Sequence, residues 1–288
     1  MALRSWLFVP GDSERKLAKA PETGADAVIV DLEDAVAPTA KSSARALARE
    51  WLGAREGGAA RWVRINAVDS GLWRDDLAAV LPGRPDGIMI PKAAGPAQVV
   101  EICNEIAALE TQVGLTEGAT KVLPLVSETP AAALGIAAYA GADLPRLAGL
   151  TWGAEDLSAE LGARSRQRAD GRWTDTFSMI RAQVLLTAHA AGVLPIDTLW
   201  ADFSDDEGLA RYAAEAVADG FAGMLAIHPR QVPIINAAFA PTEEQLAEAR
   251  AIVAAFTANP DAGTLAVNGR MVDQPHLRLA RRTLGIAE

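Results

Sequence analysis

Residues 121–128 (KVLPLVSE) and residues 147–156 (LAGLTWGAED) are the most informative parts of the chain, because each joins a short apolar run to a carboxylate. Such continuous apolar runs are typical of parallel strands covered on both faces. Glu128 ends the first stretch and Asp156 ends the second. An ionised carboxylate buried without a partner is strongly destabilising. Both side chains are therefore predicted to lie just beyond a strand and to bind a cation.

Runs of this kind occur repeatedly along the chain, and most are followed by a helix-like segment. The predicted strands are residues 4–10, 27–34, 61–66, 87–92, 121–128, 147–156, 195–202 and 221–229. The predicted helices are residues 42–52, 75–81, 96–112, 130–139, 174–191 and 205–218. The alternation of strand and helix predicts an α/β fold, a (β/α)8 TIM barrel with a C-terminal helical extension. An open, doubly wound parallel sheet is the alternative.

The length of the chain predicts how it divides. A barrel of this type takes roughly 250 residues. Residues 1–259 are therefore predicted to form the catalytic barrel domain, and residues 260–288 the extension.

The composition excludes several classes of protein. The formal charge of −10 argues against a nucleic-acid partner, since such proteins need a basic surface. Half of the 288 residues are hydrophobic, yet no run is long enough to span a membrane and no signal-peptide pattern is present. We therefore expect a soluble, cytoplasmic chain. The single cysteine, Cys103, falls on the apolar face of a predicted helix and is interpreted as a core residue.

Polar residues at the carboxyl ends of barrel strands are candidates for function, because active sites of TIM barrels lie there. The candidates are Gly11, Asp12, Glu33, Asp34, Arg64, Asn66, Lys92, Glu128, Asp156, Asp197 or Asp202, and His228.

The carboxylates among them favour Mg²⁺, or Mn²⁺, over Zn²⁺. Oxygen ligands suit hard cations, and Mg²⁺ usually takes only one or two protein carboxylates. The three histidines show no zinc spacing. Glu128 and Asp156 fit such a sparse site. The alternative is that they cap helices, since Glu128 precedes Thr129 and Pro130.

The cations at the strand ends are each open to two interpretations. The guanidinium of Arg64 can bind a carboxylate or thioester oxygen and stabilise charge that develops in a transition state. Alternatively, it pairs with Glu33 or Asp34. Lys92 is predicted to orient the acidic pair, and Arg61, placed before its strand, is predicted to be solvated.

The motifs, taken in order, resemble a known family. They are FVPGDSERKLAKA (residues 8–20), DAVIVDLEDAV (26–36), RIN (64–66), IMIPK (88–92), LPLVSET (123–129), LTWGAEDL (150–157) and GRMVDQPH (269–276). This set is similar to the citrate lyase β-subunit family, which includes malyl-CoA, β-methylmalyl-CoA and citramalyl-CoA lyases. The resemblance runs nearly from end to end of the chain.

The resemblance implies Mg²⁺-dependent, reversible carbon–carbon cleavage of a 3-hydroxyacyl thioester such as citryl-, malyl- or citramalyl-CoA. It places the metal ligands on Glu128 and Asp156, and the substrate contacts on Arg64 and Glu128. It also implies that Asp273 is the acid/base and serves a neighbouring subunit, which requires a homo-oligomer, a trimer or hexamer. By itself, Asp273 is interpreted as the N-cap of the last helix, with Pro275 just inside.

Other interpretations stay open. The thioester carrier is either CoA or an acyl carrier protein. A related aldolase of the same superfamily cleaves hydroxy keto acids without CoA, and a non-catalytic assembly or regulatory protein could keep the pocket. Two basic clusters are candidates for binding CoA, or else are solvated faces: Arg15, Lys16 and Lys19, and Arg164, Arg166 and Arg168.

Overall fold

The computed structural model describes residues 3–54 and 58–286, and the chain forms two compact units, Met1–Phe239 and Ala240–Glu288. The division falls before α10 (Glu243–Ala258), earlier than the boundary predicted from length. The physical reason is that Phe256 of this helix belongs to an apolar cluster with Val272 and Leu277 of the C-terminal unit. The ends of the two predicted domains, residues 1–2 and 287–288, lie outside the described residues.

Eight parallel strands form the centre of the first unit, in the order of the sequence. They are β1 (Ser5–Pro10), β2 (Ala27–Asp31), β3 (Ala60–Arg64), β4 (Gly87–Ile90), β5 (Lys121–Pro124), β6 (Gly149–Thr151), β7 (Leu194–Asp197) and β8 (Gly223–Ala226). β1 pairs with both β2 and β8, so the first and last strands are neighbours.

β5 and β6 close the barrel through looser contacts. Two parallel bridges join them, Val122 with Leu147 and Leu125 with Thr151. The backbone N–H of Val126 also donates to the carbonyl of Thr151 at 3.0 Å. The predicted (β/α)8 barrel is therefore confirmed, and the open doubly wound sheet is wrong because the sheet has no free edge at this point.

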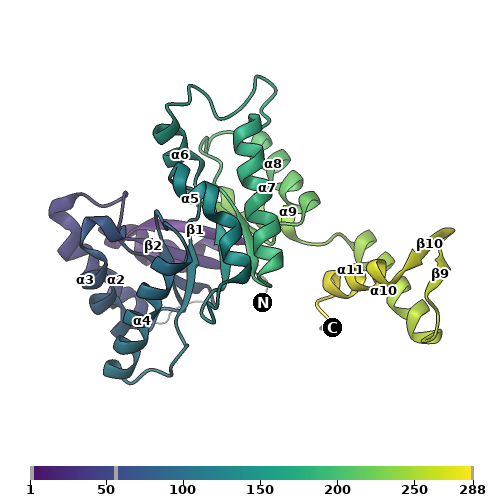
Figure 1. The fold of residues 1–288 in the computed structure, drawn as a ribbon, viewed down its shortest axis with the longest axis horizontal. Helices are drawn as coiled ribbons and strands as arrows, with labels where there is room; N and C mark the ends of the chain where they lie inside the picture. The colour runs from purple at the N-terminus through teal and green to yellow at the C-terminus, as the bar shows by residue number, and fades with distance from the viewer. Residues whose placement is uncertain (1–2, 55–57, 287–288) are drawn as a thin grey trace. The chain divides into compact units, whose positions relative to one another are not determined.

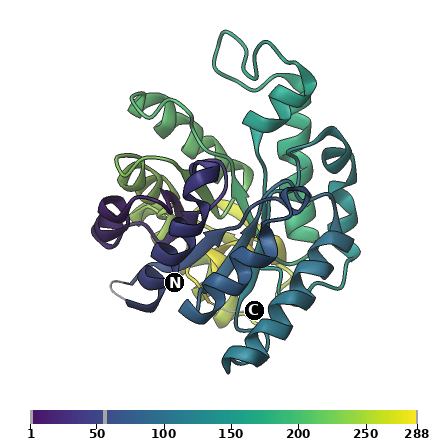
Figure 2. The same ribbon diagram turned by 90° about the vertical axis from the view of Figure 1, so that its left-hand side faces the viewer.

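Helices follow the strands and surround them (Figures 1 and 2). The α-helices of this unit are α1 (Glu14–Lys19), α2 (Lys41–Ala54), α3 (Trp73–Val80), α4 (Pro96–Val113), α5 (Pro130–Gly135), α6 (Ala154–Leu161), α7 (Asp175–Ala190), α8 (Asp206–Asp219) and α9 (Gln231–Phe239). Short 3₁₀ helices are η1 (Ala20–Thr23), η2 (Pro38–Ala40), η3 (Val68–Ser70), η4 (Leu81–Gly83) and η5 (Ile136–Gly141). Each predicted helix is present, with its ends shifted by a few residues.

Alternation along the strands divides the core in two, since successive strand residues point to opposite faces. Trp6, Ile29 and Trp62 belong to a small cluster that fills the barrel, whereas their neighbours join the larger layer under the helices. Gly87 makes room for this packing, because a Cβ there would lie only 2.2 Å from the ring of Trp62. The interior is thus filled by side chains, and the open space lies at the strand ends.

Arg61 corrects one prediction. It lies inside β3 and is 2% exposed, so the expectation of a solvated side chain is wrong. Its Nη1 donates to the carbonyls of Trp51 and Leu52, and its guanidinium lies 4.5 Å from the ring centre of Trp51. The carbonyls at the end of α2 need donors, and Arg61 supplies them.

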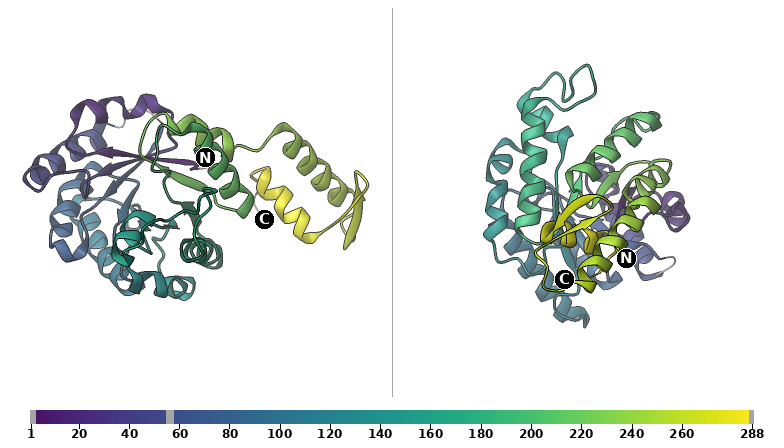
Figure 3. Two further views of the ribbon diagram at one scale, coloured as in Figure 1. Left: turned by 90° about the horizontal axis from the view of Figure 1, so that it is seen from above. Right: turned by 90° about the vertical axis from the view of Figure 1, so that its right-hand side faces the viewer.

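The C-terminal unit consists of α10, a hairpin of β9 (Thr264–Val267) and β10 (Arg270–Asp273), and α11 (Gln274–Thr283). Asn268 and Gly269 turn the hairpin with φ of 51° and 76°, as expected for a two-residue loop with left-handed backbone. Figure 3 shows α10 and α11 side by side with the hairpin at one end. No helix within the described ranges has the length and apolar character needed to cross a membrane.

Candidate active site

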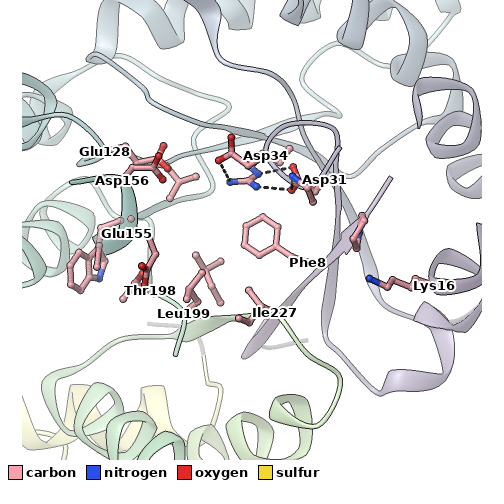
Figure 4. Close-up of a pocket in the computed structure, with 18 residues that line it drawn as sticks. Phe8, Lys16, Asp31, Asp34, Glu128, Glu155, Asp156, Thr198, Leu199 and Ile227 are labelled. Atoms are coloured by element: carbon pink, nitrogen blue, oxygen red, sulfur yellow. Dashed lines mark hydrogen bonds and ion pairs between the residues drawn. The ribbon is translucent and has the colours of Figure 1, made fainter. Parts of the chain in front are cut away.

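A cavity of about 380 Å³ opens at the carboxyl ends of the strands. Its wall combines carboxylates with apolar side chains from β1 and β8 and from the segments that follow β5, β6 and β7. Figure 4 shows Glu128 and Asp156 side by side on one wall, Asp31 and Asp34 on another, and Lys16 at the far end. The structure thus brings together the two carboxylates that the sequence singled out.

Glu128 is almost completely buried, with 2% of its surface exposed. Within the described part of the chain it has one hydrogen-bond donor, the backbone N–H of Lys92, which reaches Oε2. Burial, together with the charges of Asp156 and Glu33, raises the pKa of Glu128 to about 8. A buried carboxylate with so little compensation is suited to receive a cation.

The side chain of Glu128 packs directly against the backbone of Gly153. A Cβ at this position would approach Cγ of Glu128 to 2.9 Å and Oε1 to 3.1 Å, closer than side chains normally pack. Glycine is therefore needed here because of the close approach of Glu128. Asp156 lies three residues further on, in the first turn of α6, and its side chain is about one-third exposed.

Arg64 enters the same cavity from the end of β3. Its Nε and Nη2 bind the two oxygens of Asp31 at 2.8 and 2.6 Å, and Nη1 lies 3.1 Å from Oε2 of Glu33. Asp34 is more distant, at 3.9 Å. Burial alone would lower the pKa of Arg64, but Asp31 and Glu33 outweigh it and hold the pKa above its usual range. The guanidinium is therefore a fixed positive charge.

Asp31 is a residue that the sequence interpretation missed. It ends β2 directly opposite Arg64 in the parallel register, and its side chain also accepts from the backbone N–H groups of Glu33 and Ala35. The predicted strand ran on to Asp34, so Asp31 was placed inside it. Alignment of the two strands could have found this pair, because a buried arginine at one strand end needs a carboxylate at the next.

Lys92 connects the two walls. Its Nζ lies 2.5 Å from Glu33 Oε1, 3.6 Å from Asp34 Oδ2 and 3.7 Å from Asp156 Oδ1. Its φ of 48° is in the left-handed region, which is unfavourable for a residue with a side chain. This conformation lets the backbone N–H reach Glu128 while the side chain reaches Glu33.

Several strand-end candidates do not reach this cavity. Asp197 faces away from it and is completely buried. Asp202 is exposed and bonds Ser204, and His228 stacks on Phe203 with ring centres 5.1 Å apart. Oδ2 of Asp76 accepts hydrogen bonds from the backbone N–H and from Nδ2 of Asn66, both at 2.7 Å. These residues are therefore not part of the main cavity wall: polar partners hold Asn66, Asp197 and Asp202, and His228 lines the adjoining cavity instead.

A second, positively charged cavity adjoins the first. It holds Arg15, Lys16 and Lys19 and shares Phe8, Pro10, Lys16 and Ile227 with the main cavity. In the other basic cluster, two of the arginines already form ion pairs: Arg166 with Glu155 and Arg168 with Asp175.

Asp273 lies in the C-terminal unit. It is the N-cap of α11, and its Oδ1 lies 2.6 Å from Nδ1 of His276. The neighbouring His276 lowers the pKa of Asp273. The capping geometry expected from the sequence is therefore present.

The donor set fits a hard divalent cation. Glu128 and Asp156 offer oxygen ligands, and their mutual repulsion would be relieved by a positive charge between them. No group of three or more histidine, cysteine or acidic side chains suited to a metal occurs in residues 3–54 and 58–286. A site with two carboxylates and water is the arrangement typical of Mg²⁺.

Known proteins share this architecture. A citrate lyase subunit beta-like protein of Mycobacterium tuberculosis is 39% identical over 97% of this chain and 93% of its own length. The mitochondrial citramalyl-CoA lyase of Rattus norvegicus is 32% identical over 99% and 86%, and a (3S)-malyl-CoA thioesterase of Cereibacter sphaeroides is 36% identical over 99% and 94%.

A crystal structure of the protein CitE from Mycobacterium tuberculosis in complex with magnesium, acetoacetate and coenzyme A superposes with a TM-score of 0.78. It is 37% identical, with 99% of this chain and 97% of that one covered. Residues 4–229, almost the whole barrel unit, match the model of the HpcH/HpaI aldolase/citrate lyase family. With its barrel, its paired carboxylates and these relatives, the chain belongs to the HpcH/HpaI aldolase/citrate lyase family, which includes carbon–carbon lyases.

Proposed function

We propose that the protein is a Mg²⁺-dependent lyase that cleaves, or forms, the carbon–carbon bond of a 3-hydroxyacyl thioester. The observation that carries the proposal is the pair Glu128 and Asp156 beside the fixed guanidinium of Arg64, in a cavity that adjoins a cluster of three cations. A carboxylate-bearing thioester with a long anionic carrier matches this arrangement of charges.

Glu128 and Asp156 would hold the cation. When bound, Mg²⁺ supplies Lewis-acid stabilisation of the substrate's carboxylate and hydroxyl oxygens. Asp31 and Glu33 fix Arg64 from two sides, which leaves its remaining N–H groups to orient a substrate oxygen. Lys92 holds Glu128 through its backbone and Glu33 through its side chain. Asp34 lies near both Lys92 and Arg64 and adds to the negative charge of this support.

Cleavage breaks the bond between C2 and C3 of the thioester. The hydroxyl on C3 loses its proton as the keto group forms, and the electron pair moves to the thioester enolate, which takes a proton at C2. We assign that proton transfer to Asp273, acting on a neighbouring subunit of a trimer or hexamer. As a carboxylate it removes the C2 proton in the condensing direction, and in cleavage it returns a proton that it has taken up, so that overall the hydroxyl loses one proton and C2 gains one. The capping role of Asp273 is compatible with this assignment, because its side chain is one-third exposed.

The cationic cavity supports a CoA carrier. Arg15, Lys16 and Lys19 lie in a chain of net charge −10, and their shared wall with the main cavity gives phosphate groups a place beside the acyl site. The aldolase alternative has no anionic carrier and does not call for this cluster.

The test is turnover of a panel of thioesters by the purified full chain. Citryl-, malyl- and citramalyl-CoA, and the same acyl groups on an acyl carrier protein, are supplied with and without Mg²⁺. We expect a keto acid and an acyl thioester from at least one of them, only with the metal. Because one relative is named a thioesterase, free hydroxy acid is measured too. Hydrolysis alone, or cleavage of hydroxy keto acids without a thioester, would overturn the proposal.

A further inference from the structure

Asp197 is a buried carboxylate for which the proposed reaction has no use. It ends β7 with no exposed surface. Its Oδ1 accepts from Nε1 of Trp152, from the hydroxyl of Tyr212, both at 2.8 Å, and from the backbone N–H of Thr198 at 2.9 Å. Its Oδ2 accepts from Nε of Arg181 at 2.9 Å and pairs with Nη2 at 2.8 Å. Such a fully satisfied carboxylate has no capacity left for a metal or a substrate.

The donors around Asp197 come from three separate elements. Tyr212 lies in α8 and Arg181 in α7, so these two partners tie β7 to the surrounding helices. Trp152 is different, because it directly follows β6 and lines the main cavity. Its ring also meets Trp173 edge-on at 5.1 Å. The hydrogen bond from Trp152 to Asp197 therefore joins a buried support to the wall of the site.

Trp152 lies between two hydrogen bonds to Val126 and Ser127, the residues that precede Glu128. One residue before it, the carbonyl of Thr151 accepts from Val126, and one residue after it, the N–H of Gly153 donates to Oγ of Ser127 at 3.2 Å. Gly153 is also the surface against which Glu128 packs, and α6 with Asp156 begins at the next residue. Any rotation of this segment moves the glutamate's support and the aspartate together.

We infer that Asp197 is a positioning residue that acts through Trp152 to hold residues 151–156 in the register that places Asp156 beside Glu128. The inference rests on the proposed assignment of these two carboxylates as metal ligands. Asp197 would then anchor an outer layer of hydrogen bonds, and loss of such a layer commonly costs roughly 10- to 100-fold in metal affinity.

The chain offers a matched pair of variants for the test. Trp152→Phe and Tyr212→Phe each remove one donor from the same oxygen of Asp197, but only Trp152 is part of the segment that carries the site. Hydrogen exchange of peptides within residues 149–161 is measured in the metal-free protein, together with Mg²⁺ affinity by calorimetry. Neither measurement requires turnover.

We expect Trp152→Phe to speed exchange in this segment by roughly tenfold, the effect of losing one hydrogen bond to a charged group. Its Kd for Mg²⁺ should rise by roughly 10- to 100-fold, as for other outer-layer partners. In Tyr212→Phe, exchange of this segment and Mg²⁺ affinity should stay at the wild-type values, although the melting temperature falls.

Equal behaviour of the two variants in both measurements would overturn the inference and leave Asp197 as a purely structural group. If Trp152→Phe does not fold, Asp197→Asn is measured in its place, and unchanged exchange in residues 149–161 is then the contradicting result. A wild-type protein that binds no Mg²⁺ would instead refute the proposed function, and the exchange comparison would still decide whether Asp197 positions this segment.

Discussion

Glu128 and Asp197 are carboxylates at the same end of the barrel, and both are almost completely buried, yet they are in opposite electrostatic states. Asp197 receives donors from four residues, including the guanidinium of Arg181. Glu128 receives only the backbone N–H of Lys92 among the described residues, and two neighbouring carboxylates repel it. Both carboxylates are brought to this end of the barrel by their position at the end of a strand. The number of hydrogen-bond donors around each one then distinguishes a structural carboxylate, Asp197, from a candidate metal ligand, Glu128.

The largest expected effect is the loss of turnover in Glu128→Gln. Without this carboxylate the metal site loses several kcal/mol of charge stabilisation, so turnover should fall by roughly 10³-fold. The melting temperature of the metal-free protein should not fall, because a buried carboxyl group with one donor is replaced by a neutral amide of the same shape. Activity assays and thermal unfolding check both parts. The control is Asp202→Asn, an exposed carboxylate that bonds Ser204 and should leave turnover intact.

For Asp197→Asn we expect a large loss of stability, whereas for Glu128→Gln we expect a large loss of turnover. Asp197→Asn removes the buried carboxylate partner of Arg181, whose side chain is only 12% exposed, and leaves it the half-exposed Asp219 alone. Breaking a buried ion pair costs about 3–5 kcal/mol, and because Asp219 stays in place the free energy of unfolding should fall by about 3 kcal/mol, the lower end of that range. Urea titration followed by near-UV circular dichroism measures it. If the free energy of unfolding falls by less than about 1 kcal/mol, as for a surface ion pair, the hydrogen bonds of Asp197 contribute little to stability. The contrast drawn between Asp197 and Glu128 would then be wrong.

Arg64→Lys tests the same contrast at the two buried arginines, Arg64 and Arg181. Lysine cannot reproduce the two-point contact with Asp31, and the loss of an oriented donor should raise the barrier by roughly 3 kcal/mol, about 10²-fold in turnover. Arg181→Lys is the matched variant, since Arg181 also pairs with a buried carboxylate, although its Nε and Nη2 both approach one oxygen of Asp197. We expect the larger kinetic loss at Arg64 and the larger fall in melting temperature at Arg181. Full activity of Arg64→Lys would remove it from the mechanism.

Asp273 is a third kind of carboxylate, exposed and at the start of a helix. If it transfers the proton, Asp273→Ala should lower turnover by roughly 10²-fold while Mg²⁺ affinity is unchanged. Loss of the cap alone costs only about 1 kcal/mol of stability. Thr242→Ala removes the cap of α10 in the same unit and is the matched control.

Action across a subunit interface has its own test. Asp273→Ala protein is mixed with Glu128→Gln protein under conditions in which subunits exchange, as verified by mass. Partial return of activity is expected, because some sites then combine an intact metal pair with an intact Asp273. Absence of activity after proven exchange would show that Asp273 does not act in a neighbouring subunit.

The smallest expected effect is on the pH dependence of Mg²⁺ binding. Because burial raises the pKa of Glu128 to about 8, this carboxyl group must lose a proton to bind the metal over most of the neutral range. Affinity should therefore rise with pH up to about 8, by at most about tenfold per pH unit. Calorimetry across this range measures it, and Glu128→Gln should abolish the rise.

The sign for stability is the reverse in metal-free protein. The folded pKa of Glu128 lies above its ordinary value of 4.5, so the folded state binds more protons between that value and about 8. This contribution to stability is fully present below pH 4.5 and is lost as the pH rises through about 8. A metal-free melting temperature that rises over this range in wild type, relative to Glu128→Gln, would contradict the burial argument.

Local sequence patterns were enough to predict the barrel and the place of the two carboxylates that we propose as metal ligands. Short apolar runs separated by amphipathic helices admit few architectures, and the end of a parallel strand fixes where a following carboxylate lies. Glu128 and Asp156 were found in this way because both signals are local. The family motifs supplied the chemistry and the candidate role of Asp273.

Which polar groups at the strand ends are already satisfied can be seen only in the folded chain. Asp31 and Arg64 lie 33 residues apart in the sequence, and Trp152 and Asp197 lie 45 apart. Arg61 was expected in solvent and instead binds carbonyls at the end of α2. The physical reason is the same in each case. The partners of a buried charge come from distant elements that the fold brings together, and no local pattern records how many donors will meet at one carboxylate.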